Sequence, residues 1–344
     1  MIKVMNFLLV FCLSICLGDA YTAHPATWMY DNIDTIGQYS LREICIPGSH
    51  NSGMSICQDR TIFAPDTAIK TQTHSVADQL FLGVRYFDIR PCLMDDVFYT
   101  GHYSKLPVLG WQGANGESID DIVKSFNHFT EGRGELIMVN LSHALHVDSE
   151  KFTDMIPEEW ELLFEQLQRV RDLFCVERDD KDFDITSLKL SEFIGKKRSA
   201  VVFFVSDAVI DFSQYWGKGI YSPKNVPIFD KYSETNDHPI MVTDQLEKMF
   251  RYSDKSYFLL SWTLTQDTCD GIMSMMNSLL CKRKDQHSVL NLAGEANAVL
   301  EESLLPVCDA KRAPNVILVD DVTPGLRLLS LIFKINDKRL GAHF

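Results

Sequence analysis

The sequence predicts a single α/β domain folded as an irregular (β/α)8 barrel of the TIM type. Most of eight short predicted strands are continuous apolar runs rather than alternating ones, which is typical of strands buried on both faces of a parallel sheet. Amphipathic helical patterns lie between several of these segments. The chain of 344 residues is long enough for such a barrel, and we find no repeat, low-complexity segment or linker that would mark a second domain.

The predicted strands follow one another at irregular intervals. They comprise residues 42–46, 84–89, 97–100, 136–141, 200–205, 226–229, 257–264 and 316–319. The connections after the second and the fifth of them are too short for a full helix. We therefore expect a closed barrel with an irregular set of helices.

Four helical patterns precede or separate these strands. A short capping helix is predicted over residues 26–36, before the first strand. Residues 118–129 begin with a serine cap, and residues 157–174 begin with a proline, and both place apolar residues on one face. Residues 293–305 form the fourth pattern. Helices that alternate with buried strands in this way favour a barrel.

The first twenty residues have the composition of a secretory signal. Lys3 supplies one positive charge, residues 7–17 form an apolar core too short to span a bilayer, and small residues at 18–20 suit cleavage. We assign residues 1–20 to the signal and residues 21–344 to the barrel domain. The protein is therefore expected to be extracellular, and no later apolar run is long enough for a membrane span.

Charge and cysteine content restrict the partners and the redox state. The net charge of −14 argues against nucleic acid as a partner. Seven cysteines follow the signal, and in an oxidising compartment some should pair, with at least one left free. A Cys57–Cys92 bridge is a plausible brace for two loops, whereas Cys45, between two isoleucines, is expected to be a buried thiol. No cysteine or histidine cluster has zinc-like spacing.

Polar side chains gather at the ends of the predicted strands. The active sites of (β/α)8 barrels lie at the C-terminal ends of their strands. The residues at or just past those ends are His50, Asp88, Arg90, His102, Ser142, Ser206, Asp230 and Asp320. Two histidines supply a base and an acid near neutral pH, and an arginine supplies a fixed donor for phosphate. The set therefore indicates cleavage of a phosphodiester by an internal hydroxyl group.

Three short segments carry a resemblance to a known family. Residues 46–53 are Ile-Pro-Gly-Ser-His-Asn-Ser-Gly, residues 87–90 are Phe-Asp-Ile-Arg, and Gly101 precedes His102. Together they resemble the signature of the phosphatidylinositol-specific phospholipase C X-domain family, in its secreted, bacterial-type, metal-independent branch. The resemblance extends from about residue 27 to residue 335.

Two later segments resemble substrate-contacting and catalytic positions of that family. Residues 228–232 resemble the segment whose Asp and Tyr contact the inositol ring, and residues 319–320 resemble the strand end that carries the aspartate partner of the base histidine. The residues thereby implied to contact the head group are Asp230, Lys231 and Tyr232.

The resemblance implies a two-stage cleavage of phosphatidylinositol or of glycosyl-phosphatidylinositol anchors. His50 would deprotonate the inositol 2-hydroxyl, and His102 would protonate the departing diacylglycerol, giving inositol 1,2-cyclic phosphate. Asp320 would hold His50, and Arg90 would bind the phosphate. The expected partner is therefore a lipid at a membrane surface, met by a monomeric enzyme that has no cofactor.

The same comparison bears on metal dependence. The calcium-dependent branch carries an Asn after its first histidine and acidic residues at three other ligand positions. Here Asn51 and Asp88 offer oxygen ligands, but Arg90 and Ser142 stand at two of the acidic positions. A guanidinium at a ligand position repels Ca²⁺ and itself supplies positive charge, so we predict no metal.

Two residues depart from the bacterial pattern. Asn51 stands where those enzymes have an aspartate that assists the acid histidine, so it is expected to orient His102 without stabilising its charge as well. Asp88 is an alternative carboxylate partner for His102. Ser206 stands where they have an arginine that contacts inositol, which leaves the head-group preference open.

Several of these residues also have a purely structural interpretation. Asp88 and Arg90 could form a simple ion pair at the barrel rim, and Asp321 could exchange roles with Asp320. Residues 106–111 could be an apolar rim that enters a lipid surface or an ordinary packed loop. His143 and His146 follow the fourth predicted strand, so either could line the site, but we favour a structural role for both.

Two other functions remain open at the level of sequence. The chain could be a catalytically weak or inactive module that binds lipids or their head groups on the same barrel. It could instead be a metal-dependent barrel phosphodiesterase, such as a glycerophosphodiesterase or a sphingomyelinase D-like enzyme. Activity that disappears on chelation would favour the latter.

Overall fold

The computed structural model describes residues 24–107, 109–148, 152–176, 182–206, 210–211, 213–215, 217–266 and 288–341. The predicted signal at residues 1–20 lies outside this part of the chain. No helix of the described residues is long and apolar enough to cross a membrane.

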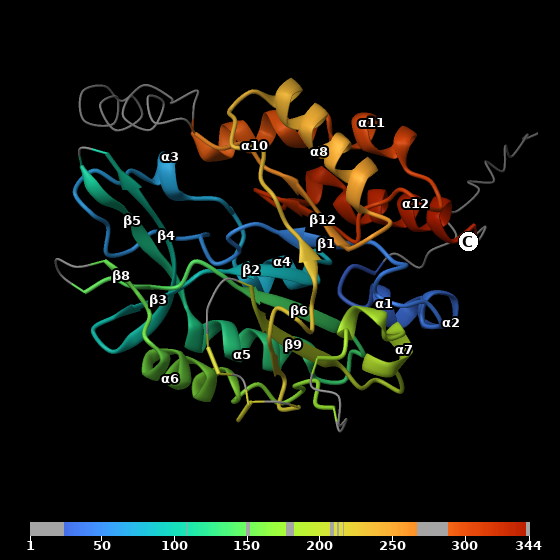
Figure 1. The fold of residues 1–344 in the computed structure, drawn as a ribbon, viewed down its shortest axis with the longest axis horizontal. Coiled ribbons are helices and arrows are strands. Elements are labelled where there is room, and N and C mark those ends of the chain that lie inside the picture. The colour runs from blue at the N-terminus through green and yellow to red at the C-terminus, as the bar shows by residue number, and fades with distance from the viewer. Residues whose placement is uncertain are drawn as a thin grey trace, which may run out of the picture.

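A curled sheet of eight parallel strands forms the centre of the molecule, as the sequence predicts (Figure 1). Its order is β10–β9–β6–β2–β1–β13–β12–β11. The strands are β1 (Ile46–Ser49), β2 (Tyr86–Ile89), β6 (Leu136–Leu141), β9 (Ala200–Val205), β10 (Ile220–Tyr221), β11 (Ile228–Phe229), β12 (Tyr257–Trp262) and β13 (Val316–Val319). In the described residues β10 and β11 do not pair, so the predicted closure is incomplete at that seam.

One predicted barrel strand belongs to a second sheet instead. Residues 97–100 begin the long strand β4 (Val97–Leu106), which pairs in antiparallel fashion with β3 (Pro91–Met94) and β5 (Gly110–Ser118). With β7 (Leu145–His146) and β8 (Thr153–Asp154) they form a five-stranded sheet. The barrel strand missed by the sequence is β10, whose two residues are too few to produce a recognisable apolar run.

The first barrel strand is also displaced from its prediction. The apolar run suggested 42–46, but β1 begins at Ile46 and includes Pro47 and Gly48, which sequence rules assign to turns. Gly48 is needed there because a Cβ atom at this position would lie 2.8 Å from a side-chain carbon of Val316 on β13. Close packing between the two strands therefore selects glycine over a typical strand residue.

The helices follow the predicted patterns with shifted ends. The predicted N-terminal helix is two short helices, the 157–174 pattern ends as a helix at Leu167, and the 293–305 pattern is interrupted at Val299. Ser118 caps α5 as predicted, since its hydroxyl accepts from the Asp121 N–H. The α-helices are α1 (Trp28–Asp31), α2 (Ile33–Ile36), α3 (Asp66–Ile69), α4 (Val76–Phe81), α5 (Ile119–Thr130), α6 (Pro157–Leu167), α7 (Leu190–Phe193), α8 (His238–Tyr252), α10 (Val289–Ala298), α11 (Leu300–Leu304) and α12 (Leu328–Leu340). Short 3-10 helices comprise Ile185–Ser187, Leu305–Val307 and Pro324–Leu326.

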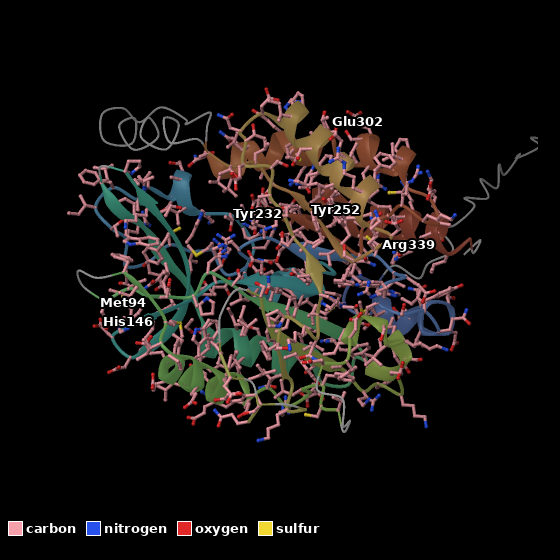
Figure 2. The ribbon with its side chains drawn as sticks, in the orientation of Figure 1. Met94, His146, Tyr232, Tyr252, Glu302 and Arg339 are labelled. Carbon is pink, nitrogen blue, oxygen red and sulfur yellow. The ribbon has the colours of Figure 1, made fainter. Side chains whose placement is uncertain are left out.

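Alternation along the strands divides the core into two layers. Tyr86 and Met138 face the barrel interior, whereas Phe87 and Val139 pack against the surrounding helices. Continuing the alternation on β2 places Asp88, and then Arg90, on the interior side at the C-terminal end. Figure 2 shows Tyr232 over the middle of the molecule, with Met94 and His146 out on the five-stranded sheet.

The predicted Cys57–Cys92 disulfide is wrong, because both thiols are free. Cys92 is buried in the five-stranded sheet, where its thiol donates to the Thr100 carbonyl at 3.2 Å and to Asn115 Oδ1 at 3.0 Å. Cys45 is buried and free, as predicted. Cys175 and Cys308 are also free, and Cys269 and Cys281 lie outside the described residues.

Candidate active site

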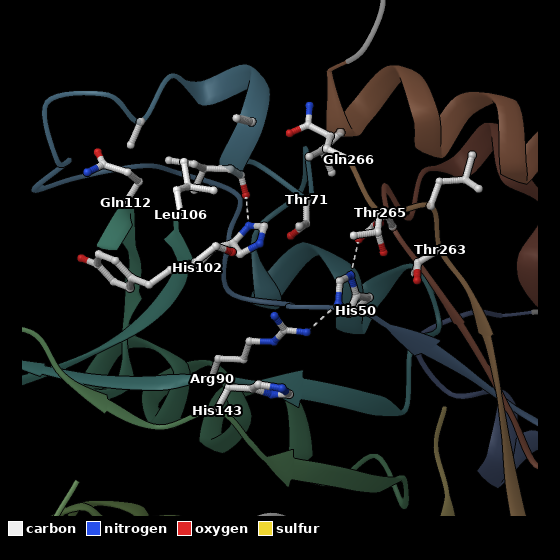
Figure 3. Close-up of a pocket in the computed structure, with 18 of the residues that line it drawn as sticks. His50, Thr71, Arg90, His102, Leu106, Gln112, His143, Thr263, Thr265 and Gln266 are labelled. Atoms are coloured by element: carbon white, nitrogen blue, oxygen red, sulfur yellow. Dashed lines mark hydrogen bonds and ion pairs between the residues drawn. The ribbon is translucent and has the colours of Figure 1, made fainter. Parts of the chain in front are cut away.

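Side chains from four separate strands meet at one pocket of about 520 Å³. His50 and Asp320 directly follow β1 and β13, Arg90 directly follows β2, and β4 carries His102 across from the second sheet. Figure 3 shows His50, Arg90 and His102 pointing into the pocket from these elements. Tyr232 also lines it.

The His50 imidazole is held at both of its nitrogens. Nδ1 lies 2.7 Å from the Asp320 carboxylate, and Nε2 lies 2.7 Å from the guanidinium of Arg90. A guanidinium only donates hydrogen bonds, so Nε2 must be the accepting nitrogen and Nδ1–H the donor to Asp320. The Tyr232 ring packs edge-on against the imidazole at 5.6 Å between centroids. His50 thus presents the tautomer that a general base requires.

Asp320, rather than its neighbour Asp321, is the partner of His50. Asp320 is buried, and one of its oxygens receives the Nδ1–H bond. Asp321 instead accepts from the Thr73 hydroxyl at 2.7 Å. The sequence register therefore identified the correct aspartate of the pair.

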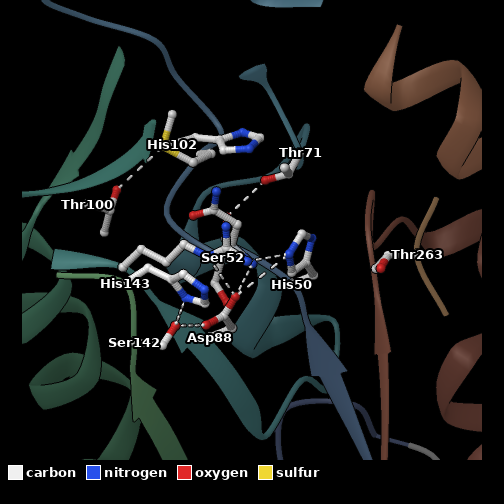
Figure 4. Close-up of polar contacts among 12 residues, drawn as sticks. His50, Ser52, Thr71, Asp88, Thr100, His102, Ser142, His143 and Thr263 are labelled. Atoms are coloured by element: carbon white, nitrogen blue, oxygen red, sulfur yellow. Dashed lines mark hydrogen bonds and ion pairs between the residues drawn. The ribbon is translucent and has the colours of Figure 1, made fainter. Parts of the chain in front are cut away.

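Asp88 anchors Arg90 beneath the pocket (Figure 4). Its carboxylate accepts from Arg90 Nε at 3.2 Å, the Asn51 N–H at 3.0 Å and the Ser142 hydroxyl at 2.8 Å. Burial by itself would raise the pKa of Asp88, but Arg90, together with His50 and other neighbours, lowers that pKa to about 2. The Asp88–Arg90 ion pair is therefore part of the site itself.

His102 has a different environment from His50. Its Nδ1 lies 2.7 Å from the Ile69 carbonyl, which only accepts, so Nδ1 carries the hydrogen. Burial first, and then the positive charge of Arg90, lower the pKa of His102 to about 3. The expectation that Asp88 or Asn51 orients this ring is wrong: the carbonyl from α3 does so.

The side chain of Asn51 is buried without a partner. Neither its Nδ2 nor its Oδ1 has a hydrogen bond to any described residue. Its backbone is left-handed, with φ at +40°, a conformation that Asn tolerates better than most residues. A buried amide without partners is costly, and Asn51 is not among the residues that line the pocket.

Of the three residues predicted to contact the head group, Tyr232 lines the pocket, whereas Asp230 and Lys231 do not. Asp230 Oδ1 is buried without a partner among the described residues, and burial, reinforced by Asp88, raises the pKa of Asp230 to about 6. The Tyr232 hydroxyl lies 3.3 Å from Arg90. Lys231 is exposed and does not line the pocket, so its predicted role in substrate binding finds no support in the geometry.

Further residues line the pocket besides the predicted catalytic and substrate-binding ones. His143 lines the wall beside Arg90, and its Nδ1 lies 2.9 Å from the Ser142 hydroxyl that bonds Asp88 (Figure 4). Its place after the end of β6 was the signal for the alternative that it lines the site, and that alternative is confirmed. Thr71 and Thr263 also line the pocket, and their sequence contexts gave no signal.

The edge of the pocket is partly apolar. Ile62 is 89% exposed and Phe63 is 36% exposed, and Phe63 lines the pocket together with Leu106. Of the segment 106–111, Leu106 faces the pocket, whereas Trp111 stacks on Phe152 at 5.8 Å. The segment thus has one end at the rim and one end packed.

The side chains around the pocket suit a site in which the Arg90 guanidinium, rather than a metal ion, supplies the positive charge. Among the described residues no group of three or more His, Cys, Asp or Glu side chains is arranged to hold a metal. Both Asp88 oxygens already accept hydrogen bonds, and the nearby Arg90 would repel a divalent cation. Arg90 occupies the place where positive charge is needed.

Comparison with known proteins begins with the sequence. No family model matches the chain. A PI-PLC X-box domain-containing protein of Dictyostelium discoideum is 29% identical over 138 residues, which cover 36% of this chain. The matched part spans only 17% of the length of that relative.

Solved structures match over almost the whole chain. A pentafluoro-Phe-containing phosphatidylinositol-specific phospholipase C from Staphylococcus aureus superposes with a TM-score of 0.62 at 17% identity, covering 91% of this chain and 98% of that one. The enzyme from Listeria monocytogenes gives 0.59 at 15% identity, with coverage of 91% and 98%. The chain therefore has the fold of the bacterial phosphatidylinositol-specific phospholipases C, and the resemblance to the X-domain family that its motifs predicted is confirmed.

Proposed function

We propose that the protein is a phosphatidylinositol-specific phospholipase C that needs no metal. The observation that carries the proposal is the convergence of His50, His102 and Arg90 on one pocket, with Asp320 bonded to His50 at 2.7 Å. These are the base, acid and cation that cleavage of a phosphodiester by an internal hydroxyl requires.

In the first stage His50 Nε2 takes the proton of the inositol 2-hydroxyl. The resulting oxygen attacks phosphorus and forms a cyclic phosphate, and the bond to the glycerol oxygen breaks. His102 protonates that leaving oxygen, so diacylglycerol departs neutral. A second stage with reversed roles, in which water opens the cyclic ester, returns both histidines to their starting states.

Arg90 changes partners during this sequence. In the free protein its guanidinium bonds His50 Nε2, the same nitrogen that must accept the substrate proton. A bound phosphate offers two anionic oxygens and draws the guanidinium toward itself, which exposes Nε2. The phosphate charge also opposes the effect of Arg90 on His102 and favours its protonated form.

The inositol ring would lie over Tyr232, between Arg90 and Asp230. Asp230 Oδ1 has no partner among the described residues and is available to inositol hydroxyls. Tyr232 offers an aromatic face beside His50. The diacylglycerol would leave toward the rim formed by Phe63 and Leu106.

Phosphorus NMR of the products from phosphatidylinositol vesicles tests the proposal. We expect inositol 1,2-cyclic phosphate to form in excess EDTA, and turnover to fall strongly in His50→Ala and in His102→Ala. Release of phosphatidic acid, or activity that chelation abolishes, would contradict it and favour a metal-dependent phosphodiesterase.

A second function is favoured by one specific observation. The low pKa of His102 and the unpartnered Asn51 leave the acid function weak in the free protein. A module that binds inositol phosphates without cleaving them would have the same pocket. Calorimetric binding of inositol phosphate without any phosphorus NMR product would support this alternative.

We propose further that the protein is exported and acts on phosphatidylinositol or on glycosyl-phosphatidylinositol anchors outside the cell. The support is the composition of residues 1–20, with an apolar core at 7–17. Expression of the full chain should give a product in the medium that begins near residue 21. Release of an anchored marker protein from cells distinguishes the anchor from the free lipid as substrate.

A further inference from the structure

A short polar segment lies between the ends of β1 and β13. It comprises Thr71, Gln72 and Thr73, which we call the 71–73 segment. The Thr71 hydroxyl donates to the Asn51 carbonyl at 2.9 Å, and the Thr71 carbonyl accepts from the Asp321 N–H at 2.8 Å. Thr73 adds its bond to the Asp321 carboxylate. The segment therefore bonds to the residue after His50 and to the residue after Asp320.

Gln72 is the centre of this segment and is completely buried. Its side-chain Nε2 donates to the His50 carbonyl at 2.9 Å and to the Val319 carbonyl at 3.2 Å. Its Oε1 accepts from the Val322 N–H at 3.0 Å. One side-chain amide thus uses both its donor and its acceptor groups on the backbones of the two strand ends.

These bonds begin where the strand ladder stops. The parallel pairing of β1 with β13 ends at Ser49 and Val319, followed by the His50 N–H bond to the Val319 carbonyl at 2.9 Å. His50 and Asp320, the two members of the hydrogen-bonded pair, come one residue later in their chains. Their spacing is no longer fixed by the ladder itself, and the Gln72 amide takes the place of a peptide group there.

We propose that Gln72 is the positioning residue that sets the His50–Asp320 hydrogen bond. It touches neither substrate nor reacting atoms, and it acts through the backbone of both partners. Loss of its amide would let the two strand ends move relative to each other, and a shift of a fraction of an ångström is enough to weaken a short hydrogen bond. The kinetic part of the inference rests on the proposed function, but the geometric part does not.

The chain contains a matched control. Gln79 is also completely buried, and its Nε2 donates to the carbonyls of Ser52 and His74 at 2.9 and 2.7 Å. Neither bond involves His50, Asp320 or the strand ends that carry them. Replacing either glutamine by glutamate removes two buried donor bonds at constant size, so the variants are matched in the donor bonds that they lose. The acceptors differ, because Gln72 Oε1 accepts from Val322 and Gln79 Oε1 has no partner among the described residues.

The experiment compares Gln72→Glu with Gln79→Glu in the full-length protein. For Gln72→Glu we expect kcat on phosphatidylinositol vesicles to fall about 10- to 100-fold, the usual effect of a small misplacement of catalytic groups, while KM changes less than about twofold. For Gln79→Glu we expect kcat within about twofold of the wild type, with a lower melting temperature as the main effect.

A second readout does not depend on turnover. The proton that His50 Nδ1 shares with Asp320 should give a downfield signal in the proton NMR spectrum, assigned by its loss in His50→Gln. We expect this signal to shift or broaden in Gln72→Glu and to stay in place in Gln79→Glu. Gln72→Met, which removes the amide without adding a carboxyl group, provides the same test if Gln72→Glu does not fold.

Two results would overturn the inference. One is a folded Gln72 variant with unchanged kcat and an unchanged His50 signal. The other is an equal change of the signal in the Gln79 variant, which would make the effect one of general stability. If the wild type does not turn over phosphatidylinositol at all, the proposed function fails, but the NMR comparison still decides the role of Gln72.

Discussion

The two histidines of the site belong to different sheets and have different hydrogen-bond partners. His50 follows a buried parallel strand, and both of its nitrogens bond ionised groups, Asp320 and Arg90. His102 lies on the antiparallel strand β4 of the second sheet, and among the described residues its ring is hydrogen-bonded to the neutral carbonyl of Ile69. One ring is held by charges, and the other is held by the backbone.

This difference in partners indicates which ring acts as the base and which as the acid. Before any ligand arrives, His50 has its proton on Nδ1, and its Nε2 lone pair accepts a hydrogen bond from the Arg90 guanidinium. His102 is kept neutral by burial and by Arg90, so it becomes an acid only when an anionic substrate offsets that positive charge. The tautomer of the base is set in advance, whereas the release of its Nε2 and the protonation of the acid both depend on the substrate phosphate.

Replacing each histidine tests this asymmetry most strongly. We expect His50→Ala to lower kcat/KM by about 10⁴-fold and His102→Ala by about 10²-fold, the upper and lower ends of the usual range for acid–base groups. The larger loss is expected at His50 because Asp320 and Arg90 are both arranged around it. Steady-state assays on phosphatidylinositol vesicles measure both losses, and equal losses would remove the distinction between the two rings.

Adding a carboxylate at position 51 should make the two regions more alike. Asn51→Asp places a negative charge in the buried position whose amide has no partner among the described residues. It should raise the pKa of His102 from about 3 and increase kcat at pH 7 by about tenfold. A pH–rate profile with an NMR titration of His102 checks this. Asn51→Leu, of similar size without charge, is the control, and a gain in both variants would contradict the electrostatic explanation.

The environment of His102 also makes stability depend on pH. Its pKa is about 3 in the folded state and about 6.5 when unfolded, so the unfolded chain binds a proton that the folded chain does not as the pH falls below about 6.5. We expect this to cost on the order of 1 kcal/mol of unfolding free energy at pH 5.5, relative to pH 7.5. Urea unfolding of wild type and His102→Gln at both pH values measures it, and equal pH dependence in both proteins would show that the cause lies elsewhere.

The smallest expected effect concerns metal removal. Arg90 supplies the positive charge at the site, so excess EDTA should leave kcat within about twofold of its untreated value. Arg90→Lys is the companion test, because it keeps a charge but loses the forked guanidinium that bonds both Asp88 and His50. Inhibition by EDTA that is reversed by Ca²⁺ would mean that Arg90 does not supply the positive charge needed for catalysis.

Residues that directly follow buried strands were predictable from sequence. His50, Arg90 and Asp320 each leave the end of such a strand, and alternation along β2 directs Asp88 to the interior side. Their convergence follows from the apolar pattern of the strands, the geometry of a barrel and the motifs around these residues. The sequence therefore determined the barrel, the strand-end positions of these residues and the family to compare.

Only the tertiary structure decided what each of these groups touches. The carbonyl that holds His102 comes from α3, the amide that bridges β1 and β13 comes from Gln72, and neither lies in a motif. The same holds for the free thiol of Cys92, where the predicted disulfide was wrong, and for the exposure of Lys231. The physical reason is that burial, pKa and hydrogen-bond partners depend on contacts between distant segments, whereas strand periodicity is a property of neighbouring residues.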